Sequence, residues 1–240
     1  MKVFVRSDIG KVRPINEDAY CLPAQGQRFC AVADGMGGHN AGEVASAMAV
    51  SIFSAELSGT NEPDGQAMRR AVECANIRIH EKSLESEACS GMGTTFTSLS
   101  FEGNIAHIAH VGDSRAYLLR NGTIMRLTLD HTLVEEMVLK GLITPREAKY
   151  HPKRNYITRA LGTMDTVEVD VIQVEILPGD VFFLCTDGLS NHVEDKKILE
   201  IAQRDCGWQE KVDAAVNFAL DAGGNDNITA MFALCEEDHK

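Results

Sequence analysis

The sequence lacks any uninterrupted apolar run close to the roughly 20 residues that a helix needs to cross a bilayer, so it predicts no membrane span. Its first eight residues alternate like a β-strand and reach charged residues too early for a secretory signal peptide. Linkers rich in proline or serine, low-complexity tracts and internal repeats are also lacking. We therefore expect a single cytoplasmic domain over residues 1–240.

Basic residues are in deficit. Lys and Arg number 23 against 35 Asp and Glu, which gives a formal net charge of -12. Sequence-independent nucleic-acid binding needs cationic side chains that displace counterions from phosphates, so this class of function is excluded. Two explanations of the acidity remain: a solubilising surface, or carboxylates gathered at a cation site.

The seven cysteines contain no Cys-x-x-Cys pair and are odd in number. Cys30, Cys185 and Cys235 lie inside apolar runs, which is typical of small buried side chains in a reducing compartment. The sequence therefore predicts neither a disulfide framework nor structural zinc.

Helical and strand periodicities come in blocks. Apolar residues recur at helical spacing over 42–57, 68–79, 198–202 and 212–219. Strand-like runs joined by turn signals occupy 94–101, 105–111, 116–119, 123–127, 169–176 and 181–185. Paired helices and hairpin-linked strands favour antiparallel sheets over a doubly wound parallel sheet. The last run, 181–185, is apolar on both faces and must be covered twice, so we predict an α+β fold: a four-layer α-β-β-α sandwich of two mainly antiparallel sheets.

Aspartates fall at the ends of these strands. Asp34 and Asp187 follow apolar runs directly, and Asp18 and Asp226 precede others. Because the end of one antiparallel strand lies beside the start of the next, these four carboxylates can share one edge of the sandwich. Crowded carboxylates need a positive charge, and hard oxygen ligands prefer Mg²⁺ or Mn²⁺. For each Asp-Gly taken alone, an ordinary turn is the alternative.

Eight segments in one order resemble the motifs of the metal-dependent Ser/Thr protein phosphatases, the protein phosphatase 2C (PPM) family, in its compact bacterial form. They are 7–18, 32–39, 90–95, 110–115, 127–132, 157–162, 184–189 and 226–229. The resemblance covers nearly the whole chain. It implies hydrolysis of phosphoserine and phosphothreonine in phosphoproteins, and a bacterial Ser/Thr kinase as the opposing enzyme.

The resemblance also assigns metal ligands. Asp34 would bridge two Mn²⁺ or Mg²⁺ ions and the Gly35 carbonyl would ligate one of them, where a side chain would crowd the ion. Asp187 and Asp226 would bind the second ion, while Asp18, together with Glu17, would act mostly through metal-bound waters. Asp113 would help to hold a weaker third ion shared with Asp187; an ordinary turn aspartate is the alternative interpretation.

Two residues would serve catalysis. Arg13 resembles the family's phosphate-binding arginine, since a guanidinium can grip two phosphate oxygens; a solvated surface residue is the alternative. His39 would donate a proton to the leaving oxygen. A histidine that caps the helix beginning near Ala41 is the competing interpretation, with water as the proton donor.

The segment 133–155 matches the position of the bacterial flap, a mobile connection that would contact substrate; a passive loop is the alternative. Two other functions stay open at this stage: a metal-dependent hydrolase of small phosphoesters, and a catalytically silent phosphatase-like binding module. Activity confined to one regulatory phosphoprotein is a further possibility. We expect a monomer.

Overall fold

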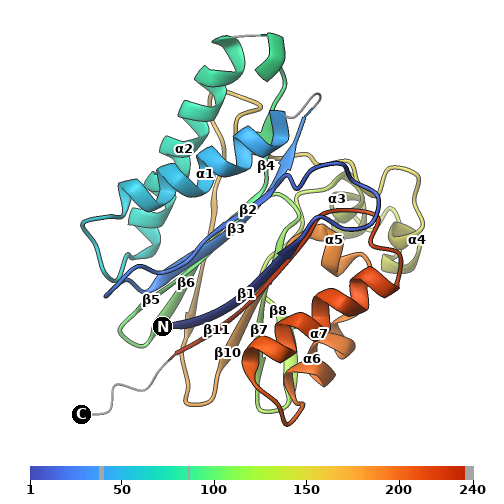
Figure 1. The fold of residues 1–240 in the computed structure, drawn as a ribbon. Coiled ribbons are helices and arrows are strands. Elements are labelled where there is room, and N and C mark those ends of the chain that lie inside the picture. The colour runs from blue at the N-terminus through green and yellow to red at the C-terminus, as the bar shows by residue number, and fades with distance from the viewer. Residues whose placement is uncertain (38–40, 86, 236–240) are drawn as a thin grey trace.

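The computed structural model describes residues 1–37, 41–85 and 87–235. It contains two antiparallel β-sheets lying face to face with helices on both outer faces (Figure 1). One sheet has the order β1-β11-β10-β7-β8, formed by Lys2–Asp8, Ile228–Leu234, Val181–Cys185, Arg115–Arg120 and Thr123–Arg126. The four-layer prediction is confirmed.

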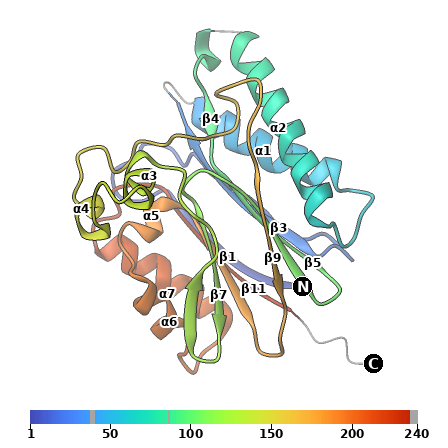
Figure 2. The same cartoon turned by 180° about the vertical axis from the view of Figure 1, so that it is seen from behind.

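The second sheet has the order β2-β3-β5-β6-β9, with the short β4 paired to β3. Its strands are Asp18–Cys21, Phe29–Met36, Phe96–Glu102, Ile105–Val111, Asp170–Glu175 and, for β4, Gly93–Thr94. Helices α1 (Ala41–Glu56) and α2 (Gly65–Glu85) cover this sheet, and the 3₁₀ turn η1 (Glu87–Cys89) follows them. Helices α6 (Asp195–Ala202) and α7 (Trp208–Asp221) cover the first sheet, on the opposite side of the molecule (Figure 2).

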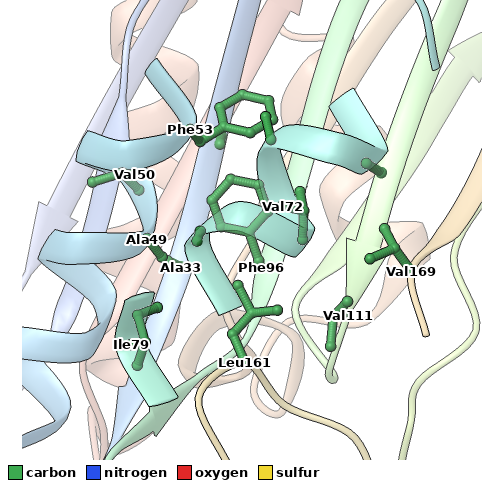
Figure 3. Packing of buried hydrophobic residues seen from close by; sticks show 14 of the residues in the cluster. Ala33, Ala49, Val50, Phe53, Val72, Ile79, Phe96, Val111, Leu161 and Val169 are labelled. Carbon is green, nitrogen blue, oxygen red and sulfur yellow. The ribbon is translucent and has the colours of Figure 1, made fainter. Parts of the chain in front are cut away.

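Strand β3 shows why the chain needs four layers. Side chains alternate across a strand, so Phe29 and Ala31 pack under α1 and α2, whereas Cys30 and Val32 point between the sheets. In the outer layer, the Phe53 ring lies 5.7 Å from that of Phe29. Figure 3 shows this layer around Phe53, with side chains from both helices and from the sheet.

Strand β10 is sandwiched in the same way. Phe182 and Leu184 enter the layer between the sheets, while Phe183 and Cys185 pack under α6 and α7. All the side chains of this strand are buried. The expectation that it is covered on both faces is confirmed.

Three short helices lie together at one end of the sandwich: α3 (Leu133–Leu139), α4 (Pro145–Lys149) and α5 (Asp187–Ser190) (Figures 1 and 2). The first two lie inside the predicted flap. Thr132 and Thr144 cap them by accepting the N–H groups of Glu135 and Glu147. In the described part of the chain, no helix is both long and apolar enough to span a membrane.

Candidate metal centre

The four strand-boundary aspartates come together at this end of the sandwich. Asp18, the first residue of β2, lies directly opposite Asp34 of β3 in the strand register. Asp187 begins α5 immediately after β10, and Asp226 lies two residues before β11. The six-stranded sheet therefore supplies two of these carboxylates and the five-stranded sheet supplies the other two.

Hydroxyl groups tie Asp18 to the opposite sheet. Its Oδ2 accepts the Thr186 hydroxyl at 2.8 Å and the Thr229 hydroxyl at 2.7 Å. Its other oxygen, Oδ1, is buried and has no hydrogen-bond partner among the described residues. One oxygen of Asp18 is thus fixed by hydroxyl groups of the protein, and the other can accept a hydrogen bond or bind a cation.

The aspartates repel one another. Burial raises the pKa of Asp18 to about 7, with the charges of Asp187 and Asp226 adding to the increase. Burial, and then the neighbouring carboxylates, also hold the pKa of Asp34 well above its ordinary value. The pKa of Asp187 is raised for the same reasons. A divalent cation would relieve this repulsion because it favours the charged forms.

Gly35 has no room for a side chain. A Cβ at this position would lie 2.1 Å from the Gly42 carbonyl oxygen and 2.6 Å from that of Glu17. Its own N–H donates to the same Glu17 carbonyl at 3.1 Å. The crowding therefore comes from the protein's backbone, where β3 meets the start of α1, in addition to any ion.

Glu17 is held mainly by its backbone. Its N–H donates to Asn227 Oδ1 at 2.8 Å, and its carbonyl accepts the Ser46 hydroxyl at 2.5 Å. Burial raises the pKa of its carboxyl, which approaches Gly42 at the start of α1. Glu17 accordingly borders the aspartate cluster from the side of α1.

Arg13 lies beside one of the aspartates. Its Nη2 donates to Asp226 Oδ2 at 2.9 Å, and its side chain remains 46% exposed. Asn227 anchors the loop that carries it, since the amide Nδ2 donates to the carbonyls of Ile9 and Ile15, each at 2.9 Å. The guanidinium is therefore placed at the cluster but stays accessible from solvent.

Asp113 follows β6 and joins the cluster from a third strand. Its side chain is 8% exposed, and its Oδ1 is buried without a hydrogen-bond partner in the described ranges. Burial and the Asp187 charge raise its pKa well above the ordinary value. The sequence-based expectation that Asp113 lies near Asp187 therefore agrees with the geometry.

A cleft of about 920 Å³ opens beside the aspartate cluster. Asp113, Asp187 and Asp226 line one part of it, and residues of the flap segment, including Tyr150 and Arg154, line another. A group bound to the aspartates would thus face the flap across the cleft.

The described residues contain no ready-made group of three His, Cys, Asp or Glu side chains arranged to hold a metal ion. Three of these carboxylates have partners within the protein: Asp226 is paired with Arg13, Asp18 with two threonines, and Asp187 with Asn191 at 3.1 Å. The donor set is nevertheless all oxygen, with two buried orphan atoms. In its chemistry, this donor set suits Mg²⁺ or Mn²⁺.

Sequence reasoning missed three residues that organise the cluster: Thr186, Thr229 and Asn227. All three lie in the segments that carried the family resemblance, directly beside or close to the aspartates. Their polar side chains at the ends of buried strands were a usable signal. His39 lies outside the described residues.

The comparisons with known proteins decide the family. The family model described as protein phosphatase 2C matches residues 13–232. The chain belongs to the protein phosphatase 2C family. Among curated relatives, it is 42% identical over 236 residues to the serine/threonine protein phosphatase PstP of Mycobacterium tuberculosis. That alignment covers 97% of this chain and 45% of PstP, so the chain spans about half the length of this relative.

Two further similarities cover both partners almost fully. The protein phosphatase PhpP of Streptococcus pneumoniae is 37% identical over 245 residues, with 99% of each chain covered. A crystal structure of the catalytic domain of PstP in complex with two manganese ions is 39% identical, covers 96% of each chain and has a TM-score of 0.86. This protein phosphatase 2C member therefore shares its fold with a manganese-binding relative.

Proposed function

We propose that the chain hydrolyses phosphoserine and phosphothreonine in other proteins, using Mn²⁺ or Mg²⁺. One observation carries the proposal: aspartates from both sheets, Asp113 on one side and Asp187 and Asp226 on the other, line an open cleft in a member of the protein phosphatase 2C family. The relatives PstP and PhpP, named as protein phosphatases, support the reaction class.

Two cations would be held by Asp34, the Gly35 carbonyl, Asp187 and Asp226, with Asp18 and Glu17 acting through waters. Asp113 would share a weaker third cation with Asp187. The bound cations would supply a water nucleophile that is deprotonated near neutral pH, together with charge neutralisation of the phosphate. Asp18 suits an outer position because two hydroxyl groups already fix one of its oxygens.

Arg13 would orient the phosphate. Its guanidinium is placed at the cluster by the Asn227-anchored loop, and its exposure leaves it free to exchange Asp226 for a phosphate oxygen. A charged, two-point hydrogen bond would hold the phosphorus in line for attack and offset charge that develops on its oxygens. His39 would protonate the leaving oxygen, with water as the alternative donor.

The cleft would hold the protein substrate. Phosphorylated proteins are the substrates that this function requires, and a cognate Ser/Thr kinase would produce them. The flap segment 133–155 would contact the substrate, since Tyr150 and Arg154 line the same cleft as the aspartates. We propose further that residues 1–240 act as one domain and as a monomer.

Release of inorganic phosphate from a phosphothreonine peptide tests the function. Turnover should require added Mn²⁺ or Mg²⁺ and stop with EDTA. p-Nitrophenyl phosphate and a phosphodiester serve as comparison substrates. Full turnover in a demetallated sample, or phosphodiester cleavage without peptide dephosphorylation, would contradict the proposal.

A further inference from the structure

The turn that carries Asp113 is held on both sides by two consecutive residues, Asp130 and His131. On one side, Gly112 and His131 exchange two hydrogen bonds: the His131 N–H donates to the Gly112 carbonyl at 2.8 Å, and the Gly112 N–H donates to His131 Nδ1 at 3.0 Å. On the other side, the Arg115 guanidinium pairs with both carboxylate oxygens of Asp130, at distances from 2.6 to 3.1 Å. His131 therefore satisfies both polar groups of the residue that precedes Asp113.

The backbone at Gly112 has little freedom to change its conformation. Its φ of 107° lies in the left-handed region that favours glycine, and a Cβ there would lie 2.6 Å from Thr95. The peptide that leads into Asp113 is thus wedged between Thr95 and His131. Its orientation depends on the ring that accepts its N–H.

The hydrogen bonds define the state of that ring. Nδ1 accepts the Gly112 N–H, so it carries no proton, and the proton of the neutral ring lies on Nε2. Nε2–H then donates to Asp170 Oδ2 at 3.1 Å. Burial, and then the nearby Arg159 charge, lower the pKa of His131, in agreement with a neutral ring.

A second contact of Nε2 points to the other tautomer. Arg159 Nη1 lies 3.1 Å from this nitrogen, which would accept a hydrogen bond only if the proton were on Nδ1. That proton would face the buried N–H of Gly112 and leave it unpaired, which is costly for a buried polar group. The Nε2–H tautomer avoids this, because Arg159 still donates to Asp170 Oδ1 at 2.7 Å. Arg159 and His131 then share Asp170 as acceptor.

A neighbouring ring limits rotation of His131. His110 packs against it with ring centroids 4.8 Å apart, and His110 Nε2 is 2.9 Å from the Leu129 carbonyl. His131 is thereby fixed by Asp170 at its edge and by His110 on its face.

We propose that His131, oriented by Asp170, is a positioning residue that presents the Asp113 carboxyl to the weaker third cation. The proposal rests on the proposed function, in which Asp113 binds that ion. It assigns a task to the segments 127–132 and 157–162, which supply no ligand of the cluster themselves. His131 touches neither substrate nor ion; it acts through the Gly112 peptide.

A pair of substitutions separates the two ring nitrogens. His131→Asn can keep an acceptor near the position of Nδ1, whereas His131→Gln places its amide near Nε2 and withdraws the acceptor from Gly112. The first readout is hydrogen exchange of the Gly112 amide in the metal-free protein, measured by NMR. We expect His131→Asn to keep the protection of this amide to within a few-fold, and His131→Gln and Asp170→Asn to lose at least about tenfold.

The second readout is a Mn²⁺ titration by calorimetry and by turnover. In His131→Gln, the two tighter ions should bind as in the wild type. The dissociation constant of the weaker ion should rise about tenfold, and so should the Mn²⁺ concentration that gives half-maximal turnover. This is the scale of effect of groups that orient metal ligands. His131→Asn should stay within about twofold. Glu168→Gln is the matched control, since it removes only an exposed partner of Arg159, at 2.9 Å, and should change nothing.

Three outcomes would overturn the proposal: a His131 nitrogen NMR spectrum of the wild type with the proton on Nδ1, a protected Gly112 amide in His131→Gln, or equal Mn²⁺ shifts in the Asn and Gln variants. The spectrum needs no variant and so decides even if the substitutions impair folding. Absence of wild-type turnover would instead refute the proposed function, while the exchange and tautomer measurements would still report on His131.

Discussion

Aspartates lie at strand boundaries at both ends of the sandwich, but the buried carboxylates at the two ends are neutralised differently. At the turn between β9 and β10, Asp180 is 4% exposed and accepts two hydrogen bonds from Arg120, at 2.8 and 2.6 Å. At the opposite end, Asp18 and Asp34 have no Lys or Arg within ion-pair distance in the described part of the chain, although burial raises the pKa of both.

This difference separates two uses of the same residue type. A structural aspartate is neutralised by the chain itself, so the loss of either partner of the pair is destabilising. Buried carboxylates that lack a basic partner, such as Asp18 and Asp34, raise the free energy of the folded chain until a cation binds. Four predictions test or sharpen this contrast.

The largest effect is expected at the cluster. Asp34→Asn should reduce phosphopeptide turnover to assay background, because it removes a charged ligand from both proposed ions. Without metal, the same variant should unfold at a higher temperature than the wild type, since repulsion among the carboxylates falls. Turnover and thermal unfolding in EDTA measure the two effects. Near-normal turnover would place Asp34 outside the reacting site.

Arg13 sits between the two classes, because its pair with Asp226 is exposed. Arg13→Ala should lower kcat/KM. The loss of transition-state stabilisation should be about 1.5–3 kcal/mol, the value of a charged hydrogen bond to phosphate. Arg13→Lys should recover only part of this, since an ammonium cannot make the two-point contact. Calorimetry should show both tighter ions retained. An alanine variant with wild-type kcat/KM would return Arg13 to the solvated surface.

Asp180→Asn should show the opposite pattern. It removes the charge that Arg120 pairs with and weakens the turn, in which Asp180 also accepts the Leu177 N–H at 2.8 Å. We expect a loss of about 1–3 kcal/mol in the free energy of unfolding, since Arg120 is partly exposed. Turnover and metal affinity should not change. Urea denaturation gives the free energy of unfolding. A changed Mn²⁺ requirement would contradict the assignment of Asp180 to a purely structural role.

The last prediction concerns pH. The raised pKa of Asp18, about 7, means that the folded state binds a proton that the unfolded state has already released above about pH 4. The stability of the metal-free protein should therefore fall as pH rises from about 4 to about 7, by up to about 1.4 kcal/mol per pH unit for each such carboxyl.

Urea denaturation in EDTA at several pH values measures this slope, and Asp34→Asn should flatten it. Saturating Mn²⁺ should reverse it, because metal binding requires the deprotonated carboxylates. A metal-free protein that gains stability over the same range would mean that the cluster is not under strain.

The layers and the family were predictable from the sequence because both depend on local patterns. The runs 105–111 and 181–185 are β6 and β10 with unchanged bounds. The two-sided apolar character of β10 sufficed to call for two covering layers. The edge shared by Asp18 and Asp34 followed from the polarity of antiparallel neighbours. The ligand roles of these residues remain predictions.

Other features depend on contacts that no local pattern contains. The hydroxyl groups of Thr186 and Thr229 reach Asp18 from the other sheet, 168 and 211 residues away along the chain. The crowding at Gly35 comes from the Gly42 backbone, which only the docking of α1 reveals. Helices α3 and α4 could have been predicted, since Thr132 and Thr144 each precede a glutamate by three residues, a helix-start signature.

The aspartate cluster straddles the seam between the sheets, so its dimensions are set by the apolar layer that separates them. Leu99 and Phe182 belong to that layer from opposite sheets, and their bulk determines how the two plates are spaced and aligned. An ion bound by ligands from both sheets would link them and resist movement of one sheet relative to the other. Any selectivity of the proposed centre for ionic radius would therefore depend partly on hydrocarbon side chains that do not contact the ion.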